Sequence, residues 1–193
     1  GFLTAVSGKN LAKAMQSIAT REFSIESRTL LSARGVADGE RFLLDAMNDF
    51  VISRGSVPRM IRLEVKVDGE VLTVYRCDGL VLSSATGSTA YSLSAGGAIV
   101  APDAGVFAIT PICPHTLSNR AVIVSQQSTV EVRMLDQRRE STLSADGWDV
   151  VGLDADSPVT INRSRRTVKL ARLPETSFFQ TLRQKLQWMG SHA

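Results

Sequence analysis

The sequence is poor in the residues that build disulfide frameworks and metal centres. Its 193 residues include two cysteines, Cys77 and Cys113, and two histidines, His115 and His192. So few cannot form a disulfide framework or a clustered His/Cys zinc site. Two unpaired thiols are typical of a cytosolic protein. We therefore expect reduced cysteines, a cytoplasmic location and no metal site formed by this chain.

The chain also lacks long apolar runs and a strong charge of one sign. No stretch of about 18 apolar residues is present, and no basic segment followed by a long apolar one opens the chain. The net charge is +3. The basic residues are scattered, with the densest groups at Arg138–Arg139 and Arg163–Arg166. We expect neither a membrane nor a nucleic acid as a partner, because a weak and scattered charge does not form a polyanion-binding surface.

Several catalytic and nucleotide-binding motifs are missing as well. The sequence has no Walker A loop, no Gly-x-Gly-x-x-Gly and no Gly-x-Ser-x-Gly nucleophile elbow. A serine hydrolase is therefore disfavoured, and a dinucleotide would have to be bound by another arrangement. We interpret His115, which follows a proline, as a hydrogen-bonding structural residue rather than a base.

What the sequence does contain is a regular succession of short apolar and β-branched segments. With turn signals every 8–12 residues, this pattern is typical of a β-rich sandwich. Residues 60–75 form the clearest element, a hairpin with Asp68-Gly69 in its tight turn. Further strands are expected at residues 1–6, 23–33, 41–48, 50–53, 80–83, 106–110, 121–125, 129–134, 141–145, 159–162 and 167–173.

A few helices complete the expected fold. Ser7 can cap a helix through about Ala19, residues 89–95 form a helical turn, and residues 175–189 form an amphipathic tail helix that Thr176 can cap. The apolar stripe of the tail helix contains Phe178, Phe179, Leu182 and Leu186. The predicted class is α+β and mainly β. We predict a β-rich domain over residues 1–173, with residues 174–193 as a helix and tail packing on the same unit.

The turn Thr86-Gly87-Ser88-Thr89 has chemistry of its own. Short hydroxyl side chains and the free N–H groups of a helix start can bind anions or the polar edges of a ligand. Taken alone, the pattern equally fits a simple helix cap. The residues around it decide between the two.

Asp78-Gly79-Leu80 followed by Thr86–Gly97 closely resembles the signature of NAD kinases. Residues 111–117 look like the second signature of that family, and Asn48-Asp49 fits its Asn-acidic pair. Gly1–Thr4 resembles the segment that opens the family's C-terminal half, and residues 185–188 resemble its closing motif. The resemblance covers essentially the whole chain in the same order and spacing.

The resemblance implies phosphoryl transfer from ATP, or from polyphosphate, to the 2′-hydroxyl of the NAD adenosine ribose, with Mg²⁺ accompanying ATP. It also implies a homo-oligomer, a dimer or a tetramer. Family members have an N-terminal α/β domain, whose Gly-Gly-Asp-Gly-Thr motif carries the base, and a β-rich NAD-binding domain. That motif occurs nowhere in these 193 residues. We therefore expect the C-terminal domain without the N-terminal one, no catalytic residue in this chain, and little kinase activity from it alone.

The resemblance assigns site residues position by position. Asn48 and Asp49 are expected at the ribose hydroxyls, Thr89, Ala90 and Tyr91 at the adenine, and Asp78 at the nicotinamide half, often from a neighbouring subunit. The remaining expected NAD contacts are Arg59, Arg76, Ser92, Leu93, Ser94 and Cys113. An aromatic ring can bind a purine by stacking, without hydrogen bonds to the edge of the base, and Tyr91 has such a ring.

Two departures from the family pattern are visible. Ser84-Ala85 replaces the usual Thr-Pro before Thr86, and Trp148 follows Asp146-Gly147 where many members have Gln. We interpret Asp146 as a turn residue. The alternative function is a catalytically silent NAD(H)-binding or assembly module. A lipid kinase of the related diacylglycerol-kinase architecture is disfavoured, because a lipid-binding site would not need the polar Thr89–Ser94 loop to bind adenine.

Overall fold

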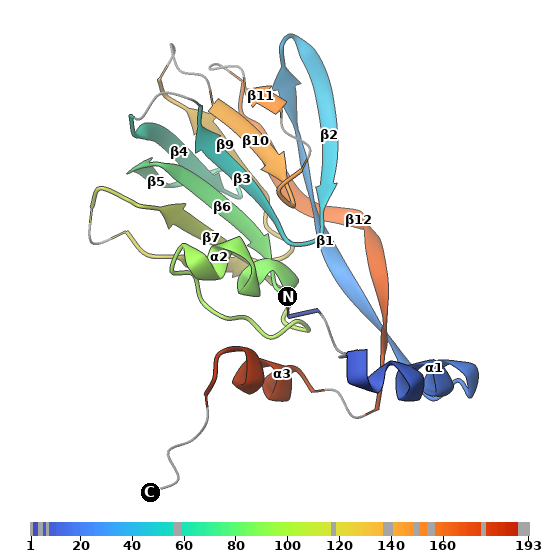
Figure 1. Cartoon of the computed structure of the whole chain (residues 1–193). Coiled ribbons are helices and arrows are strands. Elements are labelled where there is room, and N and C mark those ends of the chain that lie inside the picture. The colour runs from blue at the N-terminus through green and yellow to red at the C-terminus, as the bar shows by residue number, and fades with distance from the viewer. Residues whose placement is uncertain are drawn as a thin grey trace, which may run out of the picture. The chain divides into compact units, whose positions relative to one another are not determined.

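The computed structural model describes residues 2–3, 6, 8–55, 59–116, 119–136, 141–148, 151–153, 157–174 and 177–188 (Figure 1). Antiparallel strands form most of it, in two six-stranded sheets. The first has the order β2-β1-β12-β9-β4-β5 and the second has the order β11-β10-β3-β6-β7-β8. The mainly β architecture that the sequence predicted is therefore confirmed.

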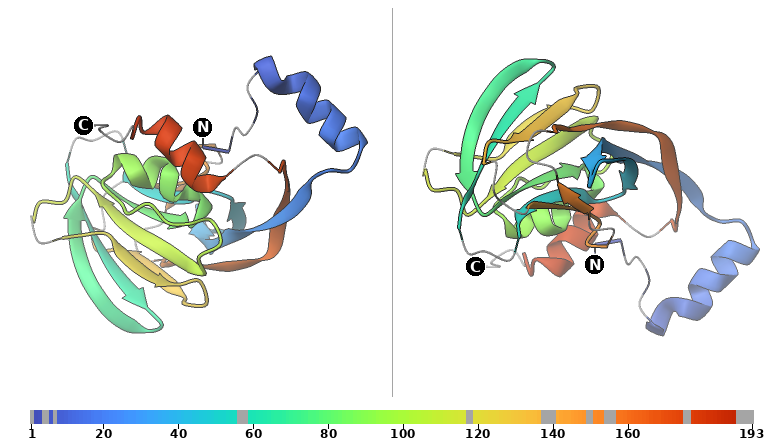
Figure 2. Two further views of the ribbon diagram at one scale, coloured as in Figure 1. Left: turned by 90° about the horizontal axis from the view of Figure 1, so that it is seen from below. Right: turned by 90° about the horizontal axis from the view of Figure 1, so that it is seen from above.

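The strands have the following bounds. They are β1 (Ser24–Ala37), β2 (Glu40–Ala46), β3 (Asp49–Arg54), β4 (Ile61–Val67), β5 (Glu70–Cys77), β6 (Gly79–Ser84), β7 (Val106–Ile112), β8 (Val122–Ser125), β9 (Val130–Met134), β10 (Ser141–Ala145), β11 (Val151–Leu153) and β12 (Val159–Arg172). Figure 2 shows the two sheets lying face to face as layers.

One face of each sheet supplies the core between the layers. Along β3 and β6, alternate residues point inward, because successive side chains of a strand lie on opposite faces. Phe50 and Ile52 of β3 join Leu80 and Leu82 of β6 in this core, together with Tyr75 from the other sheet. The opposite face of the second sheet carries the buried polar residues Asp49 and Ser83 beside Val51 and Val81.

Most predicted strands are present, with shifted ends. The hairpin of β4 and β5 turns at Asp68-Gly69, both with positive φ (52° and 87°), as predicted. Two expectations were wrong, and one strand was missed. Residues 2–3, in the expected first strand, form a turn; the two strands expected at 159–162 and 167–173 are one strand, β12; and β11 was not predicted.

The helices are short. A 3-10 turn (Gly8–Asn10) leads into α1 (Leu11–Ala19), a second 3-10 turn (Thr86–Thr89) leads into α2 (Tyr91–Ser94), and α3 is Phe178–Lys185. Ser7 and Thr176, the predicted caps, lie outside the described residues. Ser177 caps α3 instead, its Oγ accepting the Gln180 N–H. No helix of the described residues has the length and apolar character needed to cross a membrane.

The chain divides into two compact units, residues 29–167 and residues 1–28 with 168–193. The long strands β1 and β12 run from one unit into the other. The larger unit contains the sandwich core, and the smaller one contains α1 and α3. The predicted domain boundary at residues 173 and 174 and the packing of the tail on the β-rich unit stay predictions.

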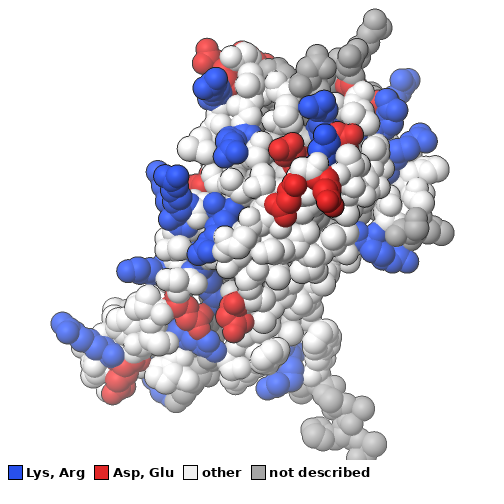
Figure 3. Space-filling model, turned by 180° about the vertical axis from the view of Figure 1, so that it is seen from behind, with Lys and Arg blue, Asp and Glu red and all other residues white. Residues whose placement is uncertain are grey.

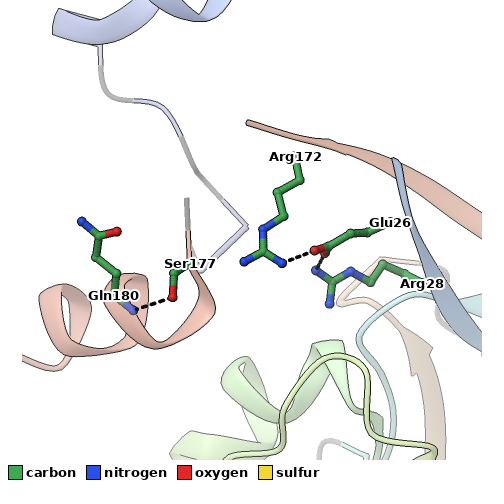
Figure 4. Close-up of polar contacts among 5 residues, drawn as sticks. All are labelled: Glu26, Arg28, Arg172, Ser177 and Gln180. Atoms are coloured by element: carbon green, nitrogen blue, oxygen red, sulfur yellow. Dashed lines mark hydrogen bonds and ion pairs between the residues drawn. The ribbon is translucent and has the colours of Figure 1, made fainter. Parts of the chain in front are cut away.

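In the smaller unit, a charged cluster joins the ends of β1 and β12. The Glu26 carboxylate accepts from Arg28 at 2.5 Å and also from Arg172, so one acid lies between two guanidinium groups (Figure 4). On the face seen in Figure 3, Lys and Arg gather at several separate places with Asp and Glu between them. This face carries no extended surface of one charge.

Candidate functional site

Asn48 and Asp49 lie at the start of β3, and an acid from the turn after β10 holds their main chain. The Asp146 carboxylate accepts hydrogen bonds from the N–H groups of Met47 (2.7 Å), Asn48 (2.7 Å) and Asp49 (3.0 Å). The Asp146 N–H in turn donates to the Asp49 carbonyl oxygen at 2.9 Å. These three hydrogen bonds hold the main chain of residues 47–49 firmly, because hydrogen bonds to a charged acceptor are stronger than neutral ones.

The other side of the same main chain is held by Ser84, the last residue of β6. Its N–H donates to the Asn48 carbonyl oxygen at 2.9 Å, and its Oγ donates to the Met47 carbonyl oxygen at 2.6 Å. The Gly87 N–H donates to the same Oγ at 3.1 Å. Ser84, one of the departures from the family pattern, therefore connects the Asn48–Asp49 segment to the hydroxyl-rich turn.

Gly87 brings that turn into direct contact with Asn48. A Cβ at this position would lie 1.9 Å from the Asn48 carbonyl oxygen, which no real contact permits. Only glycine allows this approach of two backbones. The Thr86–Thr89 turn and the Asn48–Asp49 segment, 37 or more residues apart in the chain, therefore form one structural feature.

The Asp49 side chain lies at the centre of this feature and is 4% exposed. Its carboxylate accepts a hydrogen bond from the backbone N–H of Tyr91, the first residue of α2. Burial and, to a lesser extent, the nearby Asp146 charge raise the pKa of Asp49 to about 6, although the hydrogen bond from the Tyr91 N–H acts to lower it. Asp49 thus links β3 to the start of α2 while its own charge is only weakly stabilised.

In the loop from Thr89 to Ser94, some side chains are exposed and others are buried. Tyr91 is 46% exposed, whereas Ser92 is fully buried and its hydroxyl pairs with that of Thr110 in β7 at 3.0 Å. Ser88 ties the preceding turn to residue 100, since its Oγ accepts the Val100 N–H at 3.0 Å. These hydrogen bonds of Ser88 and Ser92 hold the loop in place, and the Tyr91 side chain is exposed on its outer side.

A second group of the predicted residues lies at the other end of β6. Asp78 precedes β6 and forms an ion pair with Arg54, Nε to Oδ1 at 3.3 Å. The Arg76 carbonyl oxygen accepts the His115 N–H at 2.8 Å, which draws the segment containing the exposed Cys113 to the end of β5. Cys113 adopts a positive φ of 46°. The neighbouring Cys77 is buried, and burial raises the pKa of its thiol to about 12.

The two groups are separated by the length of β6. Gly79 and Ser84 are five steps apart along this strand, which is about 17 Å at the usual rise of roughly 3.3 Å per residue. Asn48, Asp49 and residues 89–94 lie together at one end, and Arg76, Asp78 and Cys113 at the other. Arg59 is exposed and lies between β3 and β4.

The described residues offer no ready place for a metal ion. No cluster of three or more His, Cys, Asp or Glu side chains occurs among them. Asp49 and Asp146 are near one another, but each carboxylate already accepts backbone N–H groups. The described residues therefore do not fit a protein-bound Mg²⁺, and we derive no chemical step through one.

Three residues of this feature, Ser84, Gly87 and Asp146, were not among the predicted site residues. Asp146 was interpreted as a turn residue, and Ser84 was noted only as a departure. Their contribution depends on contacts across 37 to 99 residues of sequence. The one local signal was glycine at position 87, since glycine inside a hydroxyl-rich turn indicates close approach of another backbone.

Comparison with known proteins defines the class of this fold and site. A family model described as the ATP-NAD kinase C-terminal domain matches residues 47–173. The curated NAD kinase of Chlorobium limicola is 38% identical over 193 residues, covering all of this chain and 67% of the relative. The NAD kinase of Symbiobacterium thermophilum is 41% identical over 187 residues, covering 96% of this chain and 66% of the relative.

Two solved structures have the same fold. A yeast NADH kinase complexed with NADH matches with a TM-score of 0.88 and 30% identity, covering all of this chain and 57% of that one. An NAD kinase from Archaeoglobus fulgidus in complex with ATP matches with a TM-score of 0.81 and 26% identity, covering 98% and 71%.

The fold and the sequence therefore both match the C-terminal domain of NAD kinases. The chain belongs to the NAD kinase family, whose members are phosphotransferases, and the family assignment made from the sequence is confirmed. It spans about two thirds of the length of the curated relatives described above.

Proposed function

We propose that this chain is the NAD-binding domain of an NAD kinase, an enzyme that phosphorylates the 2′-hydroxyl of the NAD adenosine ribose with ATP or polyphosphate. The observation that carries the proposal is the joining of Asn48–Asp49 to the Thr86–Tyr91 loop. Gly87 contacts Asn48, and the Tyr91 N–H donates to Asp49. Residues that the family resemblance assigns to one ligand thus lie at one place.

The chemistry of these side chains suits an adenosine. The Asn48 amide both donates and accepts, and the Asp49 carboxylate accepts, so the pair can bind two vicinal ribose hydroxyls. Tyr91 provides an exposed ring on which the adenine stacks. Thr89 and Ala90 hold the adenine edge, and Leu93 and Ser94 complete the wall. Ser92 supports the loop from below through its bond to Thr110.

The nicotinamide half requires residues from the other end of β6. We propose that Asp78, with Arg76 and Cys113 beside it, contacts the nicotinamide half of an NAD molecule held by a second copy of the chain. The assignment to a second copy comes from the family resemblance, and Asp78 lies about 17 Å along β6 from the proposed adenosine site. Arg59 is assigned to the ligand by the resemblance alone. The proposal implies a homo-oligomer, a dimer or a tetramer.

In the proposed reaction, the ribose 2′-oxygen forms a bond to the γ-phosphorus of ATP while the bond to the β,γ-bridging oxygen breaks and ADP leaves. The hydroxyl proton passes to a base, which the family resemblance places in the Gly-Gly-Asp-Gly-Thr motif. Mg²⁺ would enter with the ATP phosphates. Because phosphoryl transfer depends on positioning and charge around those phosphates, this chain contributes substrate binding and lacks the transfer machinery.

Calorimetric titration of the chain with NAD tests the proposal. We expect saturable binding, and we expect Tyr91→Ala to weaken it about 5- to 150-fold, the equivalent of one lost base stack of roughly 1–3 kcal/mol. Val71→Ala is the control, because Val71 is 58% exposed and lies in β5, an edge strand of the first sheet. Adenosine monophosphate should compete with NAD. Absence of NAD binding by the folded chain, or equal effects of both substitutions, would contradict the proposal.

A further inference from the structure

We propose that Asp146 is a positioning residue of this site: its carboxylate holds the main chain of Met47, Asn48 and Asp49 so that the Asn48 and Asp49 side chains face the ligand's ribose. The inference rests on the proposed function. Asp146 itself makes no ligand contact in this account. It acts through the residues that it holds.

The first support is the number and direction of its hydrogen bonds. Oδ1 accepts from Asn48 and Asp49, and Oδ2 accepts from Met47. Both carboxylate oxygens are therefore used on three consecutive residues. Together with the Asp146 N–H to the Asp49 carbonyl oxygen, they join the β10 end to the β3 start by four bonds.

The second support comes from comparison within the molecule. Three Asp-Gly pairs form turns with positive φ at both residues: Asp38-Gly39, Asp68-Gly69 and Asp146-Gly147. Asp68 makes the same reciprocal pair as Asp146, because its N–H donates to the Thr129 carbonyl oxygen and its Oδ1 accepts the Thr129 N–H at 2.8 Å. The two acids differ in what they hold: Asp68 accepts one backbone N–H, that of Thr129 beside β9, whereas Asp146 accepts three, including those of the predicted ribose-binding pair.

The third support is what this fixation leaves available. With Asp146 on its N–H and Ser84 on its carbonyl oxygen, the Asn48 main chain is fully bonded. Within the described part of the chain, the hydrogen bonds of Asn48 all use this main chain. The side-chain amide thus remains free for a ligand, and its place is set by a backbone held from both sides.

Asp146→Asn is the most informative change. Asparagine tolerates positive φ, so the turn is preserved while the charge is lost. Its amide oxygen can replace one carboxylate oxygen, but its NH₂ group would face an N–H donor. We expect the affinity for NAD to fall by about tenfold or more, in line with the loss of a charged hydrogen bond. Asp68→Asn makes the same chemical change in the same kind of turn and should leave NAD affinity within about twofold.

A second readout separates positioning from general destabilisation. Among the described residues, Asp146 is the charged group that acts on Asp49, whose other partner is the Tyr91 N–H. The carboxyl resonance of Asp49 should therefore titrate at lower pH in Asp146→Asn and be unchanged in Asp68→Asn. Loss of stability alone would not move it.

The outcomes are distinguishable. If wild type binds NAD and Asp146→Asn binds it equally well, this inference is wrong and the proposed function stands. If both Asp68→Asn and Asp146→Asn lose affinity equally, or the Asp49 titration does not move, the role of Asp146 is merely structural. If wild type does not bind NAD, the proposed function fails, and the inference fails with it.

Discussion

At the scale of the residue, Asp49 is a carboxylate placed where its charge is poorly stabilised. Burial and the Asp146 charge raise its pKa from 3.8 to about 6. Between about pH 4 and pH 6 the folded protein keeps the Asp49 proton while the unfolded chain has released it. Stability must therefore fall as the pH rises through this window.

This effect can be measured by urea unfolding at pH 4 and pH 7. We expect Asp49 to lower the free energy of unfolding by about 2 kcal/mol between these values, since each unit of pKa shift corresponds to roughly 1.4 kcal/mol and the unfolded carboxyl is already partly ionised at pH 4. Asp49→Asn cannot titrate and should lack this component. Its amide oxygen still accepts the Tyr91 N–H, so the loop is preserved. Identical pH dependence in both proteins would contradict the assigned pKa.

The adjacent serines of β6 give a second prediction at this scale. Ser84 bonds to Met47 and Gly87, whereas the buried Ser83 Oγ has no hydrogen-bond partner among the described residues. Ser84→Ala should cost about 1–3 kcal/mol, because it leaves buried groups unpaired. Ser83→Ala should be neutral or stabilising. Chemical denaturation of the two variants is the measurement, and equal losses would refute the difference in their bonding.

At the scale of the element, the junction of the Thr86–Thr89 turn with the start of β3 depends on Gly87. Gly87→Ala would place a methyl group against the Asn48 carbonyl oxygen and force the two segments apart. We expect NAD affinity to fall by at least about tenfold and stability to fall by about 1–3 kcal/mol, as for other overpacked sites. Calorimetry and thermal unfolding of the variant measure both effects.

Gly152→Ala is the control for that experiment. Gly152 lies in the edge strand β11, and a Cβ there would meet no atom within 4 Å. Both NAD affinity and stability should stay near the wild-type values. If Gly87→Ala behaved like Gly152→Ala, the close contact between the turn and Asn48 would not exist in solution.

The same scale shows what the sequence could and could not predict. The β4–β5 hairpin was predictable, because Asp68-Gly69 and strict alternation are local signals. The continuity of β12 was not predictable. Its charged centre, residues 163–166, indicates a loop between two strands when only the sequence is considered, but in the structure the strand continues through these residues. The Asn48–Asp49 pair and the Thr89–Tyr91 loop came from a family resemblance. The Asp146, Ser84 and Gly87 contacts that join them are tertiary, and no local pattern specifies them.

At the scale of the whole molecule, the chain spans about two thirds of its curated relatives and contains no Gly-Gly-Asp-Gly-Thr. We therefore expect no measurable NADP formation from this chain with ATP and Mg²⁺ in a coupled assay. A longer form that includes the motif should be active. If the longer form bound NAD but formed no NADP, the silent NAD-binding module would be the better description. Substantial activity of the 193-residue chain alone would contradict the proposal that this chain binds NAD but does not itself carry out phosphoryl transfer.

The central claim is that two segments far apart in the sequence form one adenosine site. Titration of the ¹⁵N-labelled chain with NAD, followed through its backbone amide resonances, tests this most directly. The account predicts the largest shifts at both residues 47–49 and residues 86–94, saturating together with a single affinity. Shifts confined to one of these segments, or the largest shifts elsewhere in the chain, would contradict it.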